Sequence, residues 1–90
     1  MRGMELHFEV IRDKETIYAE LLQSKSMGYQ LAVCYKNGEN LIVKICNVKD
    51  VTSKDQSVQI ILRSEPNDDS SEAVVELEKI ESIYPIHEFL

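Results

Sequence analysis

The dipeptide Asn37-Gly38, placed between two alternating segments, is the feature that most constrains the fold of this chain. Residues 29–36 before it and residues 41–48 after it carry aliphatic or aromatic residues at every second position, as half-buried strands do. An Asn-Gly pair favours a type I′ turn, because both central residues of that turn need positive φ. The sequence therefore predicts a β-hairpin here.

The chain after this hairpin continues to predict β-structure. Residues 49–56 are polar and indicate a connection or a bulge, and residues 57–63 alternate as a third strand. Alternation resumes at 73–77, breaks at Glu78-Lys79, and a last short strand follows. A tight corner at this break would let five short strands close into a small barrel, which removes free sheet edges.

The segment before the hairpin predicts one helix and one additional strand. Residues 5–11 alternate with period two, which is typical of a strand. Asp13 is a suitable N-cap and Gly28 a suitable stop, so we expect an amphipathic helix over 13–25. Its apolar stripe is predicted to comprise Ile17, Tyr18, Leu21 and Leu22.

Ninety residues predict a single domain with one core. We divide it into an N-terminal strand or arm (1–12), a capping helix (13–27) and a barrel (29–85) that includes an acidic loop (64–72). The fold class is mainly β (α+β): a bent five-stranded barrel with one N-terminal helix. Leu21 and Leu22 are expected to pack on the open end of the core. The inward-facing residues are predicted to be Leu31, Val33, Leu41, Val43, Ile45, Val58, Ile60, Leu62, Val75, Leu77, Ile80 and Ile83, with Lys44 facing outward.

This order of elements resembles the Sm-like (SH3-like) small β-barrel superfamily, in which Hfq has a helix capping the barrel. The stretch N-G-E-N-L (37–41) matches the hairpin turn of Hfq, and I-E-S-I-Y-P (80–85) matches the stretch after its RNA-binding lysine-histidine pair. That pair falls at Leu77 and Glu78 here, and the basic patch of the Hfq helix is missing. The resemblance implies the fold of Hfq without its RNA binding.

Two smaller Sm-like bacterial families are also similar. The Rho-binding antitermination family Rof is similar in K-N-G-E-N-L (36–41), in Lys44 and in L-E-K-I (77–80). The YolD-like family is similar in C-Y-K-N-G (34–38) and in the final I-E-S-I. Rof is small and acidic and occupies the RNA-binding surface of Rho, so this resemblance implies a regulatory module that binds a protein.

Charge supports the same expectation. Sixteen acidic residues against ten basic ones give a net charge of −6, whereas nucleic-acid binding usually relies on a basic surface. The sequence has no phosphate loop, no nucleophile motif and no zinc-protease motif, so we expect no enzyme activity. The predicted function is a non-catalytic protein-binding or regulatory module that imitates nucleic acid or occupies a nucleic-acid-binding protein. The candidate contact residues are Glu5, Glu9, Glu15, Glu20, Glu65, Asp68, Asp69 and Glu72.

Alternatives stay open at this level. The same carboxylates could simply keep the surface soluble, in a domain with a purely structural role. A local basic face could instead bind RNA or DNA, since basic residues interleaved with an aromatic suit single strands. The members of that basic face would be Lys36, Lys44, Lys49, Lys54 and Arg63.

The remaining expectations concern chemistry, location and assembly. Cys34 and Cys46 are predicted to be reduced, small hydrophobic residues with no metal and no cofactor. The start of the chain lacks a secretory pattern and no apolar run is long enough for a membrane span, so we expect a cytoplasmic location. The additional strand 5–11 is expected to lie on a sheet edge. Because an occupied edge cannot recruit a neighbour into a ring, we predict a monomer or dimer.

Overall fold

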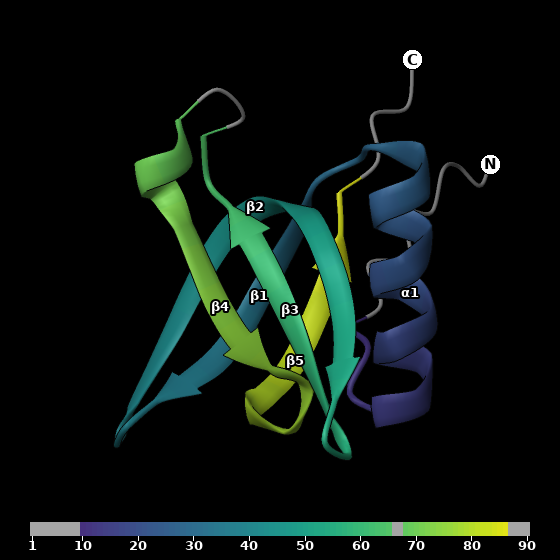
Figure 1. Cartoon of the computed structure of the whole chain (residues 1–90), viewed down its shortest axis with the longest axis vertical. Helices are drawn as coiled ribbons and strands as arrows, with labels where there is room; N and C mark the ends of the chain where they lie inside the picture. Colours follow the sequence, from purple (N-terminus) through teal and green to yellow (C-terminus); the bar gives the residue numbers. More distant parts are fainter. Residues whose placement is uncertain (1–9, 66–67, 87–90) are drawn as a thin grey trace, which may run out of the picture.

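Five antiparallel strands and one helix make up the computed structural model, which describes residues 10–65 and 68–86 (Figure 1). The strands form a single sheet in the order β4-β3-β2-β1-β5. The predicted mainly β fold with one N-terminal helix is therefore confirmed, as a barrel-like sheet that is not closed. The elements are α1 (Lys14–Met27), β1 (Leu31–Asn37), β2 (Asn40–Lys54), β3 (Ser57–Arg63), β4 (Glu72–Glu76) and β5 (Ile80–Pro85), with 3₁₀ turns η1 (Asp69–Ser71) and η2 (Leu77–Lys79) flanking β4.

The long strand β2 gives the sheet its curvature. Its first half pairs with β1 and its second half with β3, and a bulge interrupts the ladder between Val48 and Asp50. A bulge bends the strand and increases its local twist, so the two halves of the sheet turn toward each other (Figure 1). The bulge predicted within 49–56 is confirmed, but the expected polar connection is wrong because strand pairing continues to Lys54.

Both hairpin turns contain two residues. In the first, Asn37 pairs with Asn40, so the central residues are Gly38 and Glu39 rather than Asn37 and Gly38. Gly38 has φ +67° and Glu39 has no positive φ, which fits a type II′ turn with glycine at its first central position. The predicted hairpin is confirmed, with its turn one residue later than expected.

The helix α1 begins and ends at the predicted signals. The Asp13 carboxylate accepts hydrogen bonds from the Thr16 backbone N–H (3.0 Å) and from Thr16 Oγ1 (2.9 Å). At the other end Gly28, with φ +81°, donates its N–H to the Ser24 carbonyl at 2.7 Å. Among the described residues, no helix is long and apolar enough to cross a membrane.

The buried face of α1 differs in part from the prediction. Ile17 and Leu21 are fully buried as expected, and Ser24 continues the same face, with its Oγ donating to the Tyr29 carbonyl at 2.7 Å. Leu22 is 40% exposed, so its expected packing on the core is wrong. The spacing of four and three residues from Ile17 to Ser24 defines a narrow stripe, and Leu22 lies beside it.

Lys14 ties the start of α1 to the corner between β4 and β5. Its Nζ donates to the carbonyl oxygens of Leu77 (3.2 Å), Glu78 (3.0 Å) and Ile80 (2.5 Å). Carbonyl groups at the end of a helical turn carry partial negative charge, and the Leu77 carbonyl here also accepts the Ile80 N–H within η2. One ammonium group therefore binds three carbonyl oxygens and holds the helix at this corner.

One cluster forms the core, as predicted. Ten of the residues predicted to be in the core lie in this cluster or pack against it. Eight are buried (Leu21, Leu31, Val33, Ile60, Leu62, Val75, Ile80 and Ile83), and two are partly buried (Val58 and Leu77). The buried set also includes Ile17, Tyr35, Cys46 and Val48. Leu41, Val43 and Ile45 are not part of the core.

The prediction that Leu41, Val43 and Ile45 face inward is wrong. A two-residue turn fixes which residues of its two strands share a face of the sheet. Val33 pairs with Lys44, and Cys34 pairs with Val43. Inward residues of odd number on β1 must therefore lie opposite residues of even number on β2. Since a slip by one residue exchanges the two faces of a strand, the odd-numbered aliphatic residues in this half of β2 face outward. Lys44 is half-buried on the inner side, contrary to its predicted outward position.

The N-terminal segment reaches the edge of the sheet at one point. Ile11 forms an isolated antiparallel bridge with Ile83 of β5. Ile11 N–H donates to the Ile83 carbonyl at 2.8 Å, and Ile83 N–H donates back at 3.0 Å. The greater part of the predicted strand 5–11 lies outside the described residues. At Ile83, the outer edge of β5 is therefore paired with this chain's own N-terminal segment.

Candidate protein-interaction surface

Three aliphatic side chains stand in a row on the outer side of β2. Leu41 is 60% exposed, Val43 67% and Ile45 55%. They occupy alternate positions of one strand, so all three point away from the core. We call this row, Leu41, Val43 and Ile45, the outer strip.

The neighbouring strands continue this apolar face. On β1, Ala32 lies opposite Ile45, and Cys34 lies opposite Val43; both are half-buried and smaller than the residues of the outer strip. On β5, Tyr84 lies opposite Ala32. Large side chains on β2 thus stand beside small ones on β1, which makes a ridge next to a trough.

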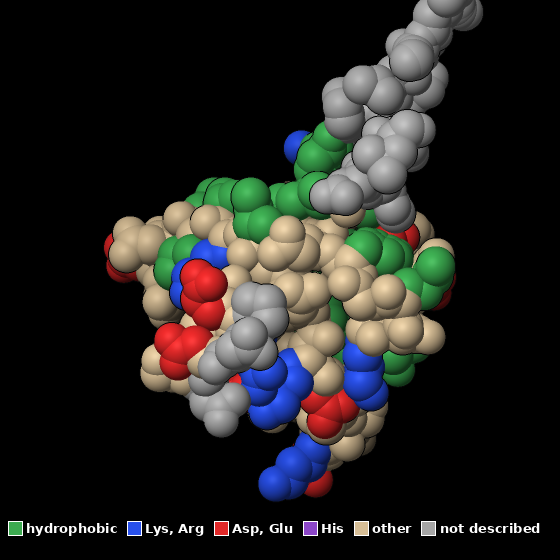
Figure 2. Space-filling model, turned by 90° about the horizontal axis from the view of Figure 1, so that it is seen from above, with side chains coloured by type: hydrophobic (Ala, Val, Ile, Leu, Met, Phe, Trp, Pro, Cys, Tyr) green, Lys and Arg blue, Asp and Glu red, His purple; other side chains and the backbone are tan. Residues whose placement is uncertain are grey.

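Charged side chains border the outer strip at its hairpin end. Lys36 pairs with Leu41 across the strands, and its Nζ lies 3.5 Å from Glu81 Oε2. In the view of Figure 2, hydrophobic side chains gather along one rim of the molecule, while many Lys, Arg, Asp and Glu side chains lie on other parts of that face. A contiguous apolar patch with a polar border is typical of interaction sites.

Among the predicted acidic contacts, Glu72 is neutralised within the molecule. Its Oε2 accepts hydrogen bonds from Lys49 Nζ (2.8 Å) and from Arg63 Nε (3.2 Å) and Nη2 (2.5 Å). These bonds hold the pKa of the Glu72 carboxyl below its ordinary value. The carboxylate of Glu72 therefore binds two of the five basic residues that the alternative nucleic-acid face would need.

The other described acidic candidates form two groups, one on α1 and one in the loop between β3 and β4, where the Asp68 N–H donates to the Glu65 carbonyl at 3.1 Å. Glu20 accepts a hydrogen bond from the Tyr29 hydroxyl; partial burial, together with this carboxylate, raises the pKa of that hydroxyl. The Asp68 carboxylate accepts from Ser70 N–H (3.0 Å) and Ser70 Oγ (2.6 Å), and these bonds lower the Asp68 pKa. Its hydrogen bonds are thus made within its own loop.

The exposed candidates Glu15 and Glu65 lie at opposite ends of the molecule. Glu15 is in the first turn of α1 and Glu65 is in the loop beside η1 (Figure 1). Asp69 begins η1, and Glu5 and Glu9 lie outside the described residues. Among the described residues, the acidic candidates thus gather at two separate places, α1 and the β3–β4 loop, rather than at one site.

The alternative basic residues are also dispersed. Lys36 pairs with Glu81, and Lys49 and Arg63 both bind Glu72. Lys44 is half-buried, and Lys54 is exposed at the end of β2. The structure does not assemble these five side chains into one face.

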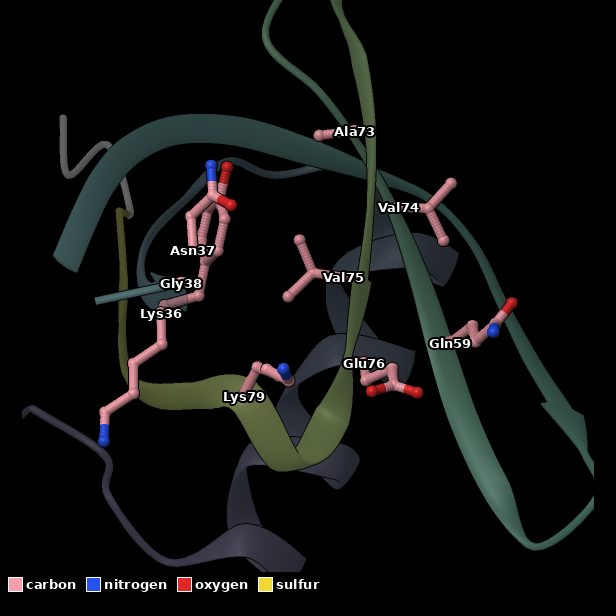
Figure 3. A pocket seen from close by; sticks show the side chains of 10 residues that line it. Lys36, Asn37, Gly38, Gln59, Ala73, Val74, Val75, Glu76 and Lys79 are labelled. Atoms are coloured by element: carbon pink, nitrogen blue, oxygen red, sulfur yellow. The ribbon is translucent and has the colours of Figure 1, made fainter. Parts of the chain in front are cut away.

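A cavity of about 390 Å³ lies on the open side of the barrel. It is bounded by the end of the β1–β2 hairpin, by β4 and by η2. Val75 points into it while Val74 points away (Figure 3). Lys79, Glu76 and Gln59 also line it. The cavity lies beside β4, which is an edge strand of the sheet, and here the sheet does not close into a barrel.

The two cysteines lie on opposite faces of the sheet. Cys46 is fully buried on the inner side, whereas Cys34 is half-buried beside the outer strip. Side chains that point to opposite faces cannot form a disulfide, and both thiols are free. Burial raises the pKa of the Cys46 thiol to about 11, although the charge of Lys44 acts against this rise. In the part of the chain that the structure describes, no three His, Cys, Asp or Glu side chains gather as a metal site would require.

Sequence reasoning missed the outer strip because it assigned these residues to the core. The parity of a two-residue turn was the signal that could have identified them, since Leu31, Val33 and Tyr35 cannot share an inner face with Leu41, Val43 and Ile45. Comparison with known proteins finds no matching family model, no similar curated protein and no similar solved structure.

Proposed function

We propose that this chain is a non-catalytic protein-binding module and that the outer strip is its contact surface. The observation that carries this proposal is the exposure of three adjacent aliphatic side chains, between 55% and 67%, on one strand. Soluble proteins rarely leave a contiguous apolar patch in water unless it meets a partner. A strand within a five-stranded sheet also holds these side chains in a fixed arrangement, which reduces the entropy cost of binding.

The charges of the described residues support a protein partner over nucleic acid. Binding to phosphates requires several basic side chains on one surface. Lys36, Lys49 and Arg63 are instead paired with carboxylates of the same molecule. The pairing of Glu72 likewise weakens the acidic loop as an imitation of nucleic acid. The outer strip is therefore a stronger candidate for the contact with a partner protein than the acidic loop is.

Capture from a native lysate with a matched pair of variants tests this proposal. Val43 on the outer strip and Val74 on β4 are both valines on strands, 67% and 62% exposed. We expect the wild-type chain and Val74→Glu to retain the same protein, and Val43→Glu to lose it by at least about tenfold, as burial of a carboxylate at a contact predicts.

Two outcomes would contradict the proposal. If Val43→Glu captured as much of the protein as the wild type does, the outer strip would not be part of the contact surface. Capture that disappears on nuclease treatment would favour the nucleic-acid alternative. Unchanged thermal unfolding of both variants controls for damage to the fold.

A further inference from the structure

We infer that the partner of the outer strip is a second copy of this chain, packed face to face. This inference rests on the proposed function, because it names the protein that the outer strip binds. Three observations carry it: the shape of the face, the distribution of charge around it and the occupied edge of β5.

The shape of this face is complementary to itself. The ridge formed by Leu41, Val43 and Ile45 runs along β2, and the trough formed by Ala32 and Cys34 runs beside it on β1. A two-fold axis between two copies places each ridge over the trough of the other. Such an isologous contact uses the same patch twice, and two sheets can stack in this way about 10 Å apart.

Charge favours this face over the others for contact between identical chains. Each copy has a net charge of −6, so two copies repel each other wherever carboxylates meet. On the outer side of the paired part of β1, β2 and β5, the described carboxylate is Glu81, which is paired with Lys36. The other described carboxylates lie at the N-cap of α1, on α1, in the turns, on the second half of β2, in the β3–β4 loop, on β4 and in η2.

The edge of β5 is less available for pairing between copies. At Ile83 its outward N–H and carbonyl groups already bind Ile11. A strand from another molecule would have to displace this bridge before it could extend the sheet. Contact through the face requires no such displacement.

Sedimentation equilibrium of the full chain over a wide range of concentration tests the inference. We expect a mass that rises to twice the 10.4 kDa of one chain, and a tighter association at higher salt, because salt screens repulsion between like-charged copies. Val43→Glu should remain a monomer, whereas the control Val74→Glu should dimerise as the wild type does.

The thiol of Cys34 gives a second readout, because it lies in the trough. In the wild type, its alkylation rate should fall severalfold as the protein concentration rises into the range where dimers form. In Val43→Glu the rate should not depend on protein concentration. This measurement reports which face is covered, which a mass alone does not.

Several results would overturn the inference. A wild-type monomer at every concentration would do so, and if lysate capture still depended on Val43, the proposed function would survive with another protein as the partner. A dimer lost in Val74→Glu but kept in Val43→Glu would place the contact at β4. A full-length monomer that dimerises only after removal of residues 1–9 would show that the N-terminal segment, not a second copy, covers the outer strip.

Discussion

At the scale of single residues, the side of the sheet on which a cysteine lies decides its reactivity. The Cys46 thiol is fully buried and its pKa is raised to about 11 by that burial, so little thiolate forms at neutral pH. Cys34 is half-buried on the outer side. We expect iodoacetamide to modify Cys34 in the dilute native protein and Cys46 only after unfolding in urea. Mass mapping of the modified peptides checks this, and rapid native labelling of Cys46 would contradict it.

Glu72 should make stability depend on pH in the acid range. Hydrogen bonds from Lys49 and Arg63 lower its pKa in the folded chain below the ordinary value of 4.5. The resulting stabilisation is fully present above about pH 4.5 and is lost as the pH falls through the folded pKa. We expect Glu72→Gln to be less stable than the wild type at neutral pH and to lose less stability on acidification. Urea unfolding from pH 7 to pH 3 measures this.

Glu65→Gln is the control for this experiment, since the side chain of Glu65 is exposed in the loop that leads to β4. Its unfolding curve should follow that of the wild type at each pH. If Glu72→Gln kept the full acid dependence of the wild type, the ion-pair network would not be its source.

At the scale of elements, the turn between β2 and β3 contains one residue that fits it poorly. Asp55 and Gln56 have φ +52° and +67°, as a type I′ turn requires; aspartate suits the first central position, but the second favours glycine. A left-handed backbone conformation destabilises the folded state by roughly 1–2 kcal/mol for an L-residue. Glycine avoids this strain but loses more conformational entropy on folding, which costs roughly 0.5–1 kcal/mol. We therefore expect Gln56→Gly to stabilise the fold by up to about 1 kcal/mol.

Gln59→Gly provides the opposite case. Gln59 lies within β3, where glycine weakens a strand, so this variant should lose roughly 0.5–1 kcal/mol. Equilibrium unfolding of the two variants gives both values. A loss of stability in Gln56→Gly would show that the side chain of Gln56 contributes more than its backbone conformation costs.

Most elements could be predicted from sequence because local signals agree with the fold. Asp13 and Gly28 mark the ends of α1, and alternation marks β1 and β3. The first half of β2 could not be assigned by hydrophobicity alone, because Leu41, Ile42 and Val43 offer apolar residues to both faces. The outer strip follows from the register that the two-residue turn fixes, whereas the bridge of Ile11 and the ion pairs of Glu72 depend on tertiary contacts that no local pattern contains.

At the scale of the whole molecule, the bridge between Ile11 and Ile83 limits how the chain can associate. Removing residues 1–11 would free the N–H and carbonyl groups of Ile83 that now bind Ile11. Because β4 is the other edge of the described sheet, a freed β5 edge could pair with β4 of a neighbouring molecule and extend the sheet from chain to chain. We expect this truncation to form species larger than two chains or to aggregate, as light scattering would measure.

A shorter truncation is the matched control. Removing residues 1–9 leaves the Ile11 bridge in place, so this variant should form nothing larger than two chains. If both truncations behaved alike, the bridge would not be what protects the edge of β5.

The sharing of β2 between two hairpins has a kinetic consequence. Both hairpins close through two-residue turns, whereas the pairing of β1 with β5 joins distant segments such as Leu31 and Pro85. Closing a long loop costs more entropy than closing a short one, so contacts between distant segments tend to form late. We expect Ile60→Val to slow refolding and Ile83→Val mainly to speed unfolding in stopped-flow measurements. The strand β5 would then be the last strand to pair with the sheet during folding.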